Sequence, residues 1–301
     1  MAKDGSVDCI ETTKDNHRLK KQNLQLEKKL SHQSQRVANQ KEQVTRILGR
    51  VQSNFRDTVR ALVDLMEMFH PALGGHCKRV AMLARKTVQQ LELPSQESSS
   101  IEMAAALHDI GMIGLPTKLF DTSPDRLSPE EQKIFYTHTD IGYKLLSRID
   151  FLKKAALLIL FHHHELENIS PPHAWEKGAF MIGLRILQAV DFCDRAIHKN
   201  KHDIEDVIPM LRQRMPAKTR EDAKILSLVE TGIRKWLGAK GEHPVKLHQL
   251  RPNMILSRDV KTKDGKVLMM VEGSVLTDIQ IIRLKALNQL SPLGKIWVYE
   301  E

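Results

Sequence analysis

The stretch that decides the fold is AAALHDIGMIGLP, residues 104–116. It starts as an apolar run of good helix formers, sets His108 beside Asp109, and ends in glycines and a proline that break a helix. Imidazole and carboxylate groups together are ligands for Fe, Mn, Ni or Zn, in contrast to the thiolate pairs of a structural zinc knuckle. The sequence therefore predicts metal-ligating groups at His108 and Asp109, in a helical stretch that breaks at Leu115-Pro116.

The chain on both sides of this stretch has a helical pattern. From Phe55 to about Leu237, apolar residues recur at spacings of three and four, and the pattern breaks at prolines such as Pro71, Pro94 and Pro116. We expect an all-helical domain at residues 55–240.

The sequence after Gly241 changes from a helical pattern to one typical of short strands. It predicts a hairpin turn at Asp264-Gly265 and a further helix. The expected strands are 245–250, 254–260, 266–271 and 295–299, and the expected helix is 277–290. The fold class is thus mainly α, with a small α+β C-terminal domain at residues 241–301.

The N-terminal segment, residues 1–54, is predicted to be a basic helical arm. The 301-residue chain has a net charge of +9, and residues 1–50 supply +5 of it, from eleven Lys or Arg against six Asp or Glu. A coiled-coil-like seam recurs every seventh residue, at Leu30, Val37, Val44 and Val51. Such a helix can pair with a second copy, dock on its own globular domain, or grip nucleic acid. The lack of interleaved aromatics and of a compact arginine cluster argues against nucleic acid and leaves a connecting or homodimerising helix.

Cysteine usage and hydropathy predict a cytoplasmic protein. Cys9, Cys77 and Cys193 are scattered and form no CxxC pair, which fits a reducing compartment. The longest apolar run, 155–161, is far shorter than the roughly 20 residues that span a bilayer. We therefore expect no membrane span.

Histidines are concentrated in the part of the chain around residues 104–116. Of the 14 histidines in the chain, eight lie between residues 70 and 173, several of them beside carboxylates. A carboxylate has two oxygens and can bridge two metal ions, and Asp109 is the natural bridge. Neighbouring residues on a helix point about 100° apart, so at most two of the consecutive His162, His163 and His164 can address one ion.

These motifs resemble, in order and spacing, the HD-GYP subfamily of HD-superfamily metal phosphohydrolases, the bacterial cyclic-di-GMP phosphodiesterases. The resemblance covers about residues 60–210. Its elements are GGHCKRVAMLA (74–84), HDIGMIGLP (108–116), FYTHTDIGYKLL (135–146), HHE (163–165) and GLRILQAVDFCD (183–194).

The resemblance implies an HD-type helical fold and two or three divalent ions, with iron or manganese favoured. It makes Asp109 a catalytic residue as well as a ligand, and it offers Glu67 as a ligand of a third metal. His162 is then read as an extra histidine on the helix face, and Asp194 as a residue that orients the Asp191 end. The implied ligands are His76, His108, Asp109, His138, His163, His164 and Asp191, with Glu67 added.

Three departures from the family pattern concern groups other than the metal ligands. Met112 stands where the family has a lysine that acts on the substrate phosphate, and a thioether cannot donate a proton. Residues 168–172, NISPP, replace the DGxGYP loop and are one residue short of it. The basic residues at 195–201 are not placed as in the family.

Three functions follow from this balance of matches and departures. The first is hydrolysis of cyclic-di-GMP to pGpG or GMP at a bi- or trinuclear metal site. The alternative is a catalytically weak or inactive signalling module that binds a cyclic dinucleotide or a partner protein. The third is metal-dependent hydrolysis of another phosphorylated nucleotide, because the same metal chemistry serves both ester classes.

Overall fold

The computed structural model describes residues 5–299, except 171, 174, 176–177 and 238–240. The chain divides into two units, residues 1–56 and 57–301, and the division falls inside helix α1, Gly5–Phe69. The domain limits at residues 54 and 240 stay predictions. No helix in the described part of the chain combines the length and the apolar character that crossing a bilayer requires.

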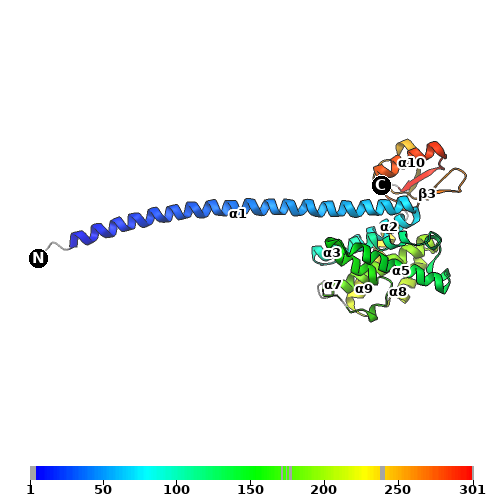
Figure 1. Cartoon of the computed structure of the whole chain (residues 1–301), viewed down its shortest axis with the longest axis horizontal. Coiled ribbons are helices and arrows are strands. Elements are labelled where there is room, and N and C mark those ends of the chain that lie inside the picture. Colours follow the sequence, from blue (N-terminus) through cyan, green and yellow to red (C-terminus); the bar gives the residue numbers. More distant parts are fainter. Residues whose placement is uncertain (1–4, 171, 174, 176–177, 238–240, 300–301) are drawn as a thin grey trace. The chain divides into compact units, whose positions relative to one another are not determined.

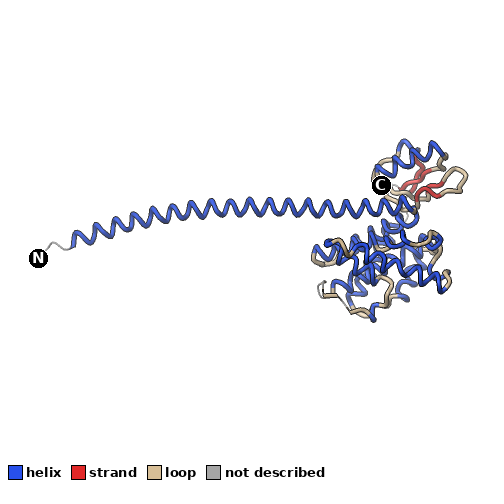
Figure 2. The backbone as a smooth tube through the Cα atoms, viewed as in Figure 1, coloured by secondary structure: helices blue, strands red, loops and turns tan. Residues whose placement is uncertain are grey.

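Helices dominate the second unit, and this confirms the predicted mainly-α class (Figure 2). After α1 the α-helices are α2 (Pro71–Val88), α3 (Ser95–Leu107), α4 (Lys118–Asp121), α5 (Pro129–Leu146), α6 (Lys153–Phe161), α7 (Ala179–Asp194), α8 (Ile204–Arg214), α9 (Arg220–Leu237) and α10 (Asp278–Leu290). The 3-10 turns are η1 (Ile110–Gly114), η2 (Pro124–Arg126), η3 (Asp150–Leu152), η4 (Leu166–Asn168) and η6 (Leu247–Gln249), and η5 (Arg195–Lys199) is a π turn.

Helix boundaries follow the local signals. Pro71 opens α2, and the His70 imidazole accepts the Leu73 N–H at 3.4 Å as an N-cap. Ser128 and Glu131 form a reciprocal capping box at the start of α5. The predicted breaks at Pro71 and Pro94 are therefore confirmed.

Helix α7 packs against α2, α3, α6, α8 and α9. The bundle that these helices form is drawn from cyan to yellow in Figure 1. The α7 side chains Phe180, Leu184 and Leu187 are fully buried. Burial of each such side chain stabilises the fold by about 1.5–3 kcal/mol. This packing fixes the end of α7, where Asp191 lies.

The C-terminal subdomain, residues 241–299, contains two antiparallel strand pairs and α10. Strand β1 (Glu242–Val245) pairs with β4 (Ile296–Tyr299), and β2 (Val260–Lys261) pairs with β3 (Leu268–Met270). The predicted hairpin turn is confirmed, with Gly265 at φ +73° between β2 and β3.

The strand predicted at 245–250 is wrong. The strand ends at Val245, and Leu247–Gln249 form a 3-10 turn instead. The register of β1 is set by its pairing with β4, which lies about 50 residues further along the chain, so local alternation could not place it.

Helix α1 presents the predicted seam in the first unit. Leu30, Val37, Val44 and Val51 are 67%, 58%, 55% and 39% exposed. The repeat every seventh residue therefore forms an apolar stripe on the surface of the helix.

Candidate metal centre

Asp109 is positioned by a close contact between two backbones. Helix α3 ends at Leu107, and the chain turns through His108 and Asp109 into η1. A methyl group at Gly111 would overlap the His138 carbonyl oxygen, so only glycine lets η1 lie directly against α5. The turn thereby brings Asp109 next to His138.

Four histidines around Asp109 are buried and have similar ring orientations. In each of them the Nδ1 atom faces an oxygen acceptor. The distances are 2.6 Å from His76 to Asp194 Oδ2, 3.0 Å from His108 to the Ala105 carbonyl, 2.6 Å from His138 to the Phe135 carbonyl and 2.7 Å from His162 to the Ile159 carbonyl. In the neutral ring Nδ1 then carries the proton and donates it, and Nε2 keeps a lone pair.

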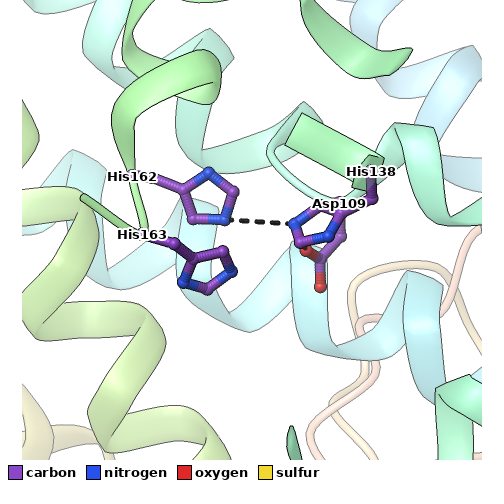
Figure 3. Close-up of side chains that lie close together, drawn as sticks. All are labelled: Asp109, His138, His162 and His163. Carbon is purple, nitrogen blue, oxygen red and sulfur yellow. Dashed lines mark hydrogen bonds and ion pairs between the residues drawn. The ribbon is translucent and has the colours of Figure 1, made fainter. Parts of the chain in front are cut away.

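These Nε2 atoms converge in two pairs. His76 Nε2 lies 3.1 Å from His108 Nε2, and His138 Nε2 lies 3.5 Å from His162 Nε2 (Figure 3). Two lone pairs at such a distance repel each other unless a cation lies between or beside them. The arrangement therefore fits a site built for positive charge.

Within the two groups of potential ligands, the buried atoms Asp109 Oδ1 and His163 Nε2 have no hydrogen-bond partner among the described residues. Asp109 Oδ1 lies 3.3 Å from His138 Nε2, which has no proton to give when Nδ1 holds it. An unsatisfied buried carboxylate oxygen is costly in a protein and is expected where a metal completes its coordination.

The potential ligands form two groups that share Asp109. One contains Asp109, His138, His162 and His163, and the other contains His76, His108 and Asp109. The atoms within each group lie within 4.8 Å of one another. Asp191 joins the second group, because its Oδ1 lies 3.0 Å from His76 Nε2 and 3.4 Å from His108 Nε2.

Arg195 lies against the two carboxylates. The π turn η5 begins at this residue, directly after α7, and π turns occur frequently at functional sites. Its Nη2 donates to Asp109 Oδ2 at 2.8 Å and its Nε donates to Asp191 Oδ1 at 2.7 Å. Burial by itself would raise the pKa of both carboxyl groups, but the Arg195 and histidine charges hold each pKa well below its usual value.

The surroundings keep several imidazoles neutral, as a metal ligand must be. Burial lowers the pKa of His138 and takes the pKa of His162 well below its usual value. Burial also lowers the pKa of His163 to about 3. For His108 burial acts in the same direction, but the charge of Asp109 and the hydrogen bond to Asp191 leave its pKa raised.

The structure brings most of the predicted ligands together and leaves two apart. Those brought together are His76, His108, Asp109, His138, His163 and Asp191. His164 is exposed, and its ring packs on Phe161 at 5.4 Å between ring centroids. Glu67 is buried, but its carboxylate accepts from Lys78 at 2.7 Å, from Ser274 at 3.1 Å and from Gln280.

His162 belongs to the cluster, and its interpretation as an extra histidine on the helix face is wrong. Helix α6 ends at Phe161, and His162 and His163 point from that end towards Asp109 and His138 (Figure 3). The length of the loop after the histidines is the signal that could have identified it. If the family's histidine pair is placed on His162-His163 instead of His163-His164, the loop that ends at Pro172 is no longer one residue short of the family's loop.

Asp194 supports His76 rather than Asp191. It accepts from His76 Nδ1 at 2.6 Å and from Arg79 at 2.7 and 2.9 Å. Because a carboxylate behind the ring fixes the tautomer and orientation of a ligand histidine, Asp194 directs the His76 lone pair to the centre.

Two cavities adjoin the centre, and Arg195 and Lys199 line both. The first, of about 230 Å³, is reached past His76 and Asp109, and it is also lined by Met112. The second, of about 590 Å³, lies on the side of His162 and His163. The centre is therefore accessible from two sides.

Comparison with known proteins finds a family model and several relatives. Residues 60–203 match the family model described as HD domain. The chain is 28% identical over 173 residues to the cyclic di-GMP phosphodiesterase response regulator RpfG of Xanthomonas campestris pv. campestris, covering 57% of this chain and 46% of that protein. It is 30% identical over 137 residues to a cyclic di-GMP phosphodiesterase of Thermotoga maritima, covering 44% and 37%.

A third relative is the 3'3'-cGAMP-specific phosphodiesterase 3 of Vibrio cholerae, which is 25% identical over 136 residues, covering 45% of this chain and 29% of that protein. The matched segment spans less than half the length of each of these three relatives. The GYP tripeptide does not occur in this chain. Residues 60–203 thus match the HD domain model, and the similarity to these relatives supports the predicted resemblance to HD-GYP-like HD-superfamily phosphohydrolases, here without the GYP motif.

Proposed function

We propose that this chain is a metal-dependent phosphodiesterase that hydrolyses a cyclic dinucleotide, with cyclic-di-GMP as the first candidate. Relatives named as phosphodiesterases for cyclic di-GMP and 3'3'-cGAMP support the substrate class. The observation that carries the proposal is the convergence of buried histidine rings on Asp109, whose Oδ1 has no hydrogen-bond partner in the described part of the chain.

The donor set fits two divalent ions. We propose His76, His108, Asp109 and Asp191 as the ligands of one ion, and His138, His162, His163 and Asp109 as the ligands of the other. Imidazole with carboxylate and without thiolate suits iron or manganese. Bound there, such ions supply Lewis acidity to phosphoryl oxygens and lower the pKa of water.

The residues of the chain itself position the substrate. Arg195 and Lys199 lie where the two cavities meet, so a phosphodiester at the centre can accept hydrogen bonds from the Arg195 guanidinium. Asp194 and Arg79 hold the His76 ring in place, and Phe135 packs beside His138 with 5.0 Å between ring centroids. This arrangement orients one phosphodiester against a rigid cluster.

Purified protein loaded with Mn²⁺ or Fe²⁺ under low oxygen is expected to bind two ions per chain and to convert cyclic-di-GMP to pGpG or GMP. Metals are quantified by elemental analysis, and products are separated by chromatography. Chelation of the metal should stop the reaction, and readdition should restore it.

Two bound ions without product would favour the alternative, a module that binds a nucleotide or a partner without catalysis. Met112 and the absent GYP motif favour that alternative, because they remove groups that the resemblance assigns to substrate or partner recognition. Product with an equal rate in the chelated protein would contradict the metal-dependent mechanism.

We also propose that the N-terminal helix pairs with a second copy of the chain along Leu30, Val37, Val44 and Val51. Burying this exposed stripe in a two-stranded coiled coil satisfies the seven-residue repeat. Val37→Glu with Val44→Glu is expected to convert a dimer to a monomer in sedimentation velocity. Gln35→Glu with Asn39→Glu adds the same charge on the opposite side of the helix, where both residues are exposed, and should leave the dimer intact. A monomeric parent chain at tens of micromolar would exclude this pairing.

A further inference from the structure

The cavity of about 230 Å³ has one wall from outside the helical bundle. Asp259, Leu268, Val271 and Glu272 of the C-terminal subdomain line it, opposite Met112 and His76. The C-terminal subdomain therefore contributes directly to the space beside the candidate metal centre.

This wall is held by specific contacts. Arg79 Nη1 donates to the Glu272 carbonyl at 2.9 Å, while its other nitrogens hold Asp194. Ser274 and Gln280 donate to the buried Glu67 carboxylate on α1. Partners on the subdomain thus satisfy a buried charge of the helical unit, as a permanent contact requires.

Close packing at Gly75 supports the same conclusion. A methyl group on Gly75 would overlap the Val271 side chain, so α2 and the segment after β3 approach as closely as backbone and side chain allow. Arg79 lies one turn further along α2 and links the Glu272 carbonyl, through Asp194, to the ligand His76. The wall and the metal centre therefore share one rigid support.

The two cavities differ in chemical character. The surface of the smaller one is predominantly apolar, with contributions from Leu73, Met112, Phe120, Leu268 and Val271. The larger one is predominantly polar. Sites for whole small ligands usually have volumes of about 300–1,000 Å³, so the smaller cavity fits only part of a dinucleotide.

We propose that the smaller cavity binds one nucleobase of the substrate, with Leu268 and Val271 of the C-terminal subdomain as its specificity-determining wall. The inference rests on the proposed function and extends it to residues outside the HD domain. A flat aromatic base suits an apolar slot that contains a thioether, whereas phosphate requires the cations at the junction of the cavities. Met112 then serves as a base contact at a position where a lysine would bring charge.

The test compares two substrates in the full-length, manganese-loaded protein. One is cyclic-di-GMP, and the other is bis(p-nitrophenyl) phosphate, a phosphodiester without a purine. Leu268→Ala removes part of the wall at a half-buried position, and Val267→Ala changes the neighbouring residue, which is 51% exposed and does not line the cavity. Metal content and thermal unfolding are measured for both variants.

Leu268→Ala is expected to lower the ratio of kcat/KM for cyclic-di-GMP over that for the aryl diester about tenfold, mostly through KM. Val267→Ala should leave the ratio within about twofold of the parent. Metal content should be unchanged in both, because neither residue is a proposed ligand.

An unchanged ratio in Leu268→Ala, with an active parent protein, would overturn the nucleobase cavity and leave the phosphodiesterase proposal standing. A parent protein that cleaves the aryl diester but not cyclic-di-GMP would instead refute the proposed substrate. A parallel loss of both activities, with loss of metal, would show that the wall serves only to support His76.

Discussion

Asp109→Asn is expected to abolish hydrolysis and to reduce metal binding to both groups of ligands. Asp109 belongs to both groups and has a buried oxygen without a hydrogen-bond partner among the described residues. Asparagine keeps the size but offers one neutral oxygen in place of a charged bridge. The loss should exceed the 10–100-fold that removing an outer partner of a metal ligand typically causes, so more than about 100-fold in metal affinity and activity.

Isothermal titration with Mn²⁺ and product chromatography measure these two losses. Asp140→Asn is the matched control, because Asp140 lies on α5 two residues after His138 and is exposed. It should retain both metal ions and activity. Full activity in Asp109→Asn with two bound ions would contradict the shared-ligand assignment.

Arg195→Met is expected to destabilise the metal-free protein while strengthening metal binding. The Arg195 guanidinium is the cation that contacts both Asp109 and Asp191, and its side chain is 16% exposed. Removing one partner of a buried ion pair leaves the other charge uncompensated, which costs about 3–5 kcal/mol. Divalent ions compete with Arg195 for the same carboxylates, so their affinity should rise about tenfold or more without it.

Hydrolysis should move in the opposite direction. If Arg195 anchors the phosphodiester, Arg195→Met raises KM and lowers kcat/KM although the metal sites fill more easily. Denaturant unfolding with and without Mn²⁺ measures the stability change, and metal should restore more stability to the variant than to the parent.

Arg212→Met is the control for loss of an arginine ion pair. Arg212 binds Glu230 through two hydrogen bonds but is 65% exposed, so the change should stay within about 1 kcal/mol. If both metal affinity and activity fall in Arg195→Met, Arg195 holds the ligands in place. That result would contradict competition between Arg195 and the metal ions for the carboxylates.

Much of the centre could be predicted from local sequence. The residue types of the His108-Asp109 pair pointed to metal ligation, and the predicted helix break lay at Leu115-Pro116; the helix in fact ends at Leu107, just before the pair. Neighbouring residues on a helix point about 100° apart, so at most two of the three consecutive histidines could address one ion. The cluster includes two of them, His162 and His163. Such statements depend on short stretches of backbone, whose geometry is set by the residues within them.

The identity of that histidine pair required the tertiary structure. Whether His162 or His164 faces Asp109 depends on the residue at which α6 ends, and that end is set by its packing against α5, α3 and α7. The same holds for Glu67, a carboxylate at a plausible spacing whose partners, Ser274 and Gln280, lie more than 200 residues away.

The sequence by itself predicted the helical class, the imidazole and carboxylate types of the candidate cluster and the seven-residue seam, because periodicity and side-chain chemistry are local properties. Only the tertiary structure decided that Arg195 binds the carboxylates of Asp109 and Asp191 and that Asp194 accepts a hydrogen bond from His76. It also decided that the C-terminal subdomain forms one wall of a cavity beside the centre. These features depend on contacts between distant segments, and their geometry is set by the packing of the whole unit.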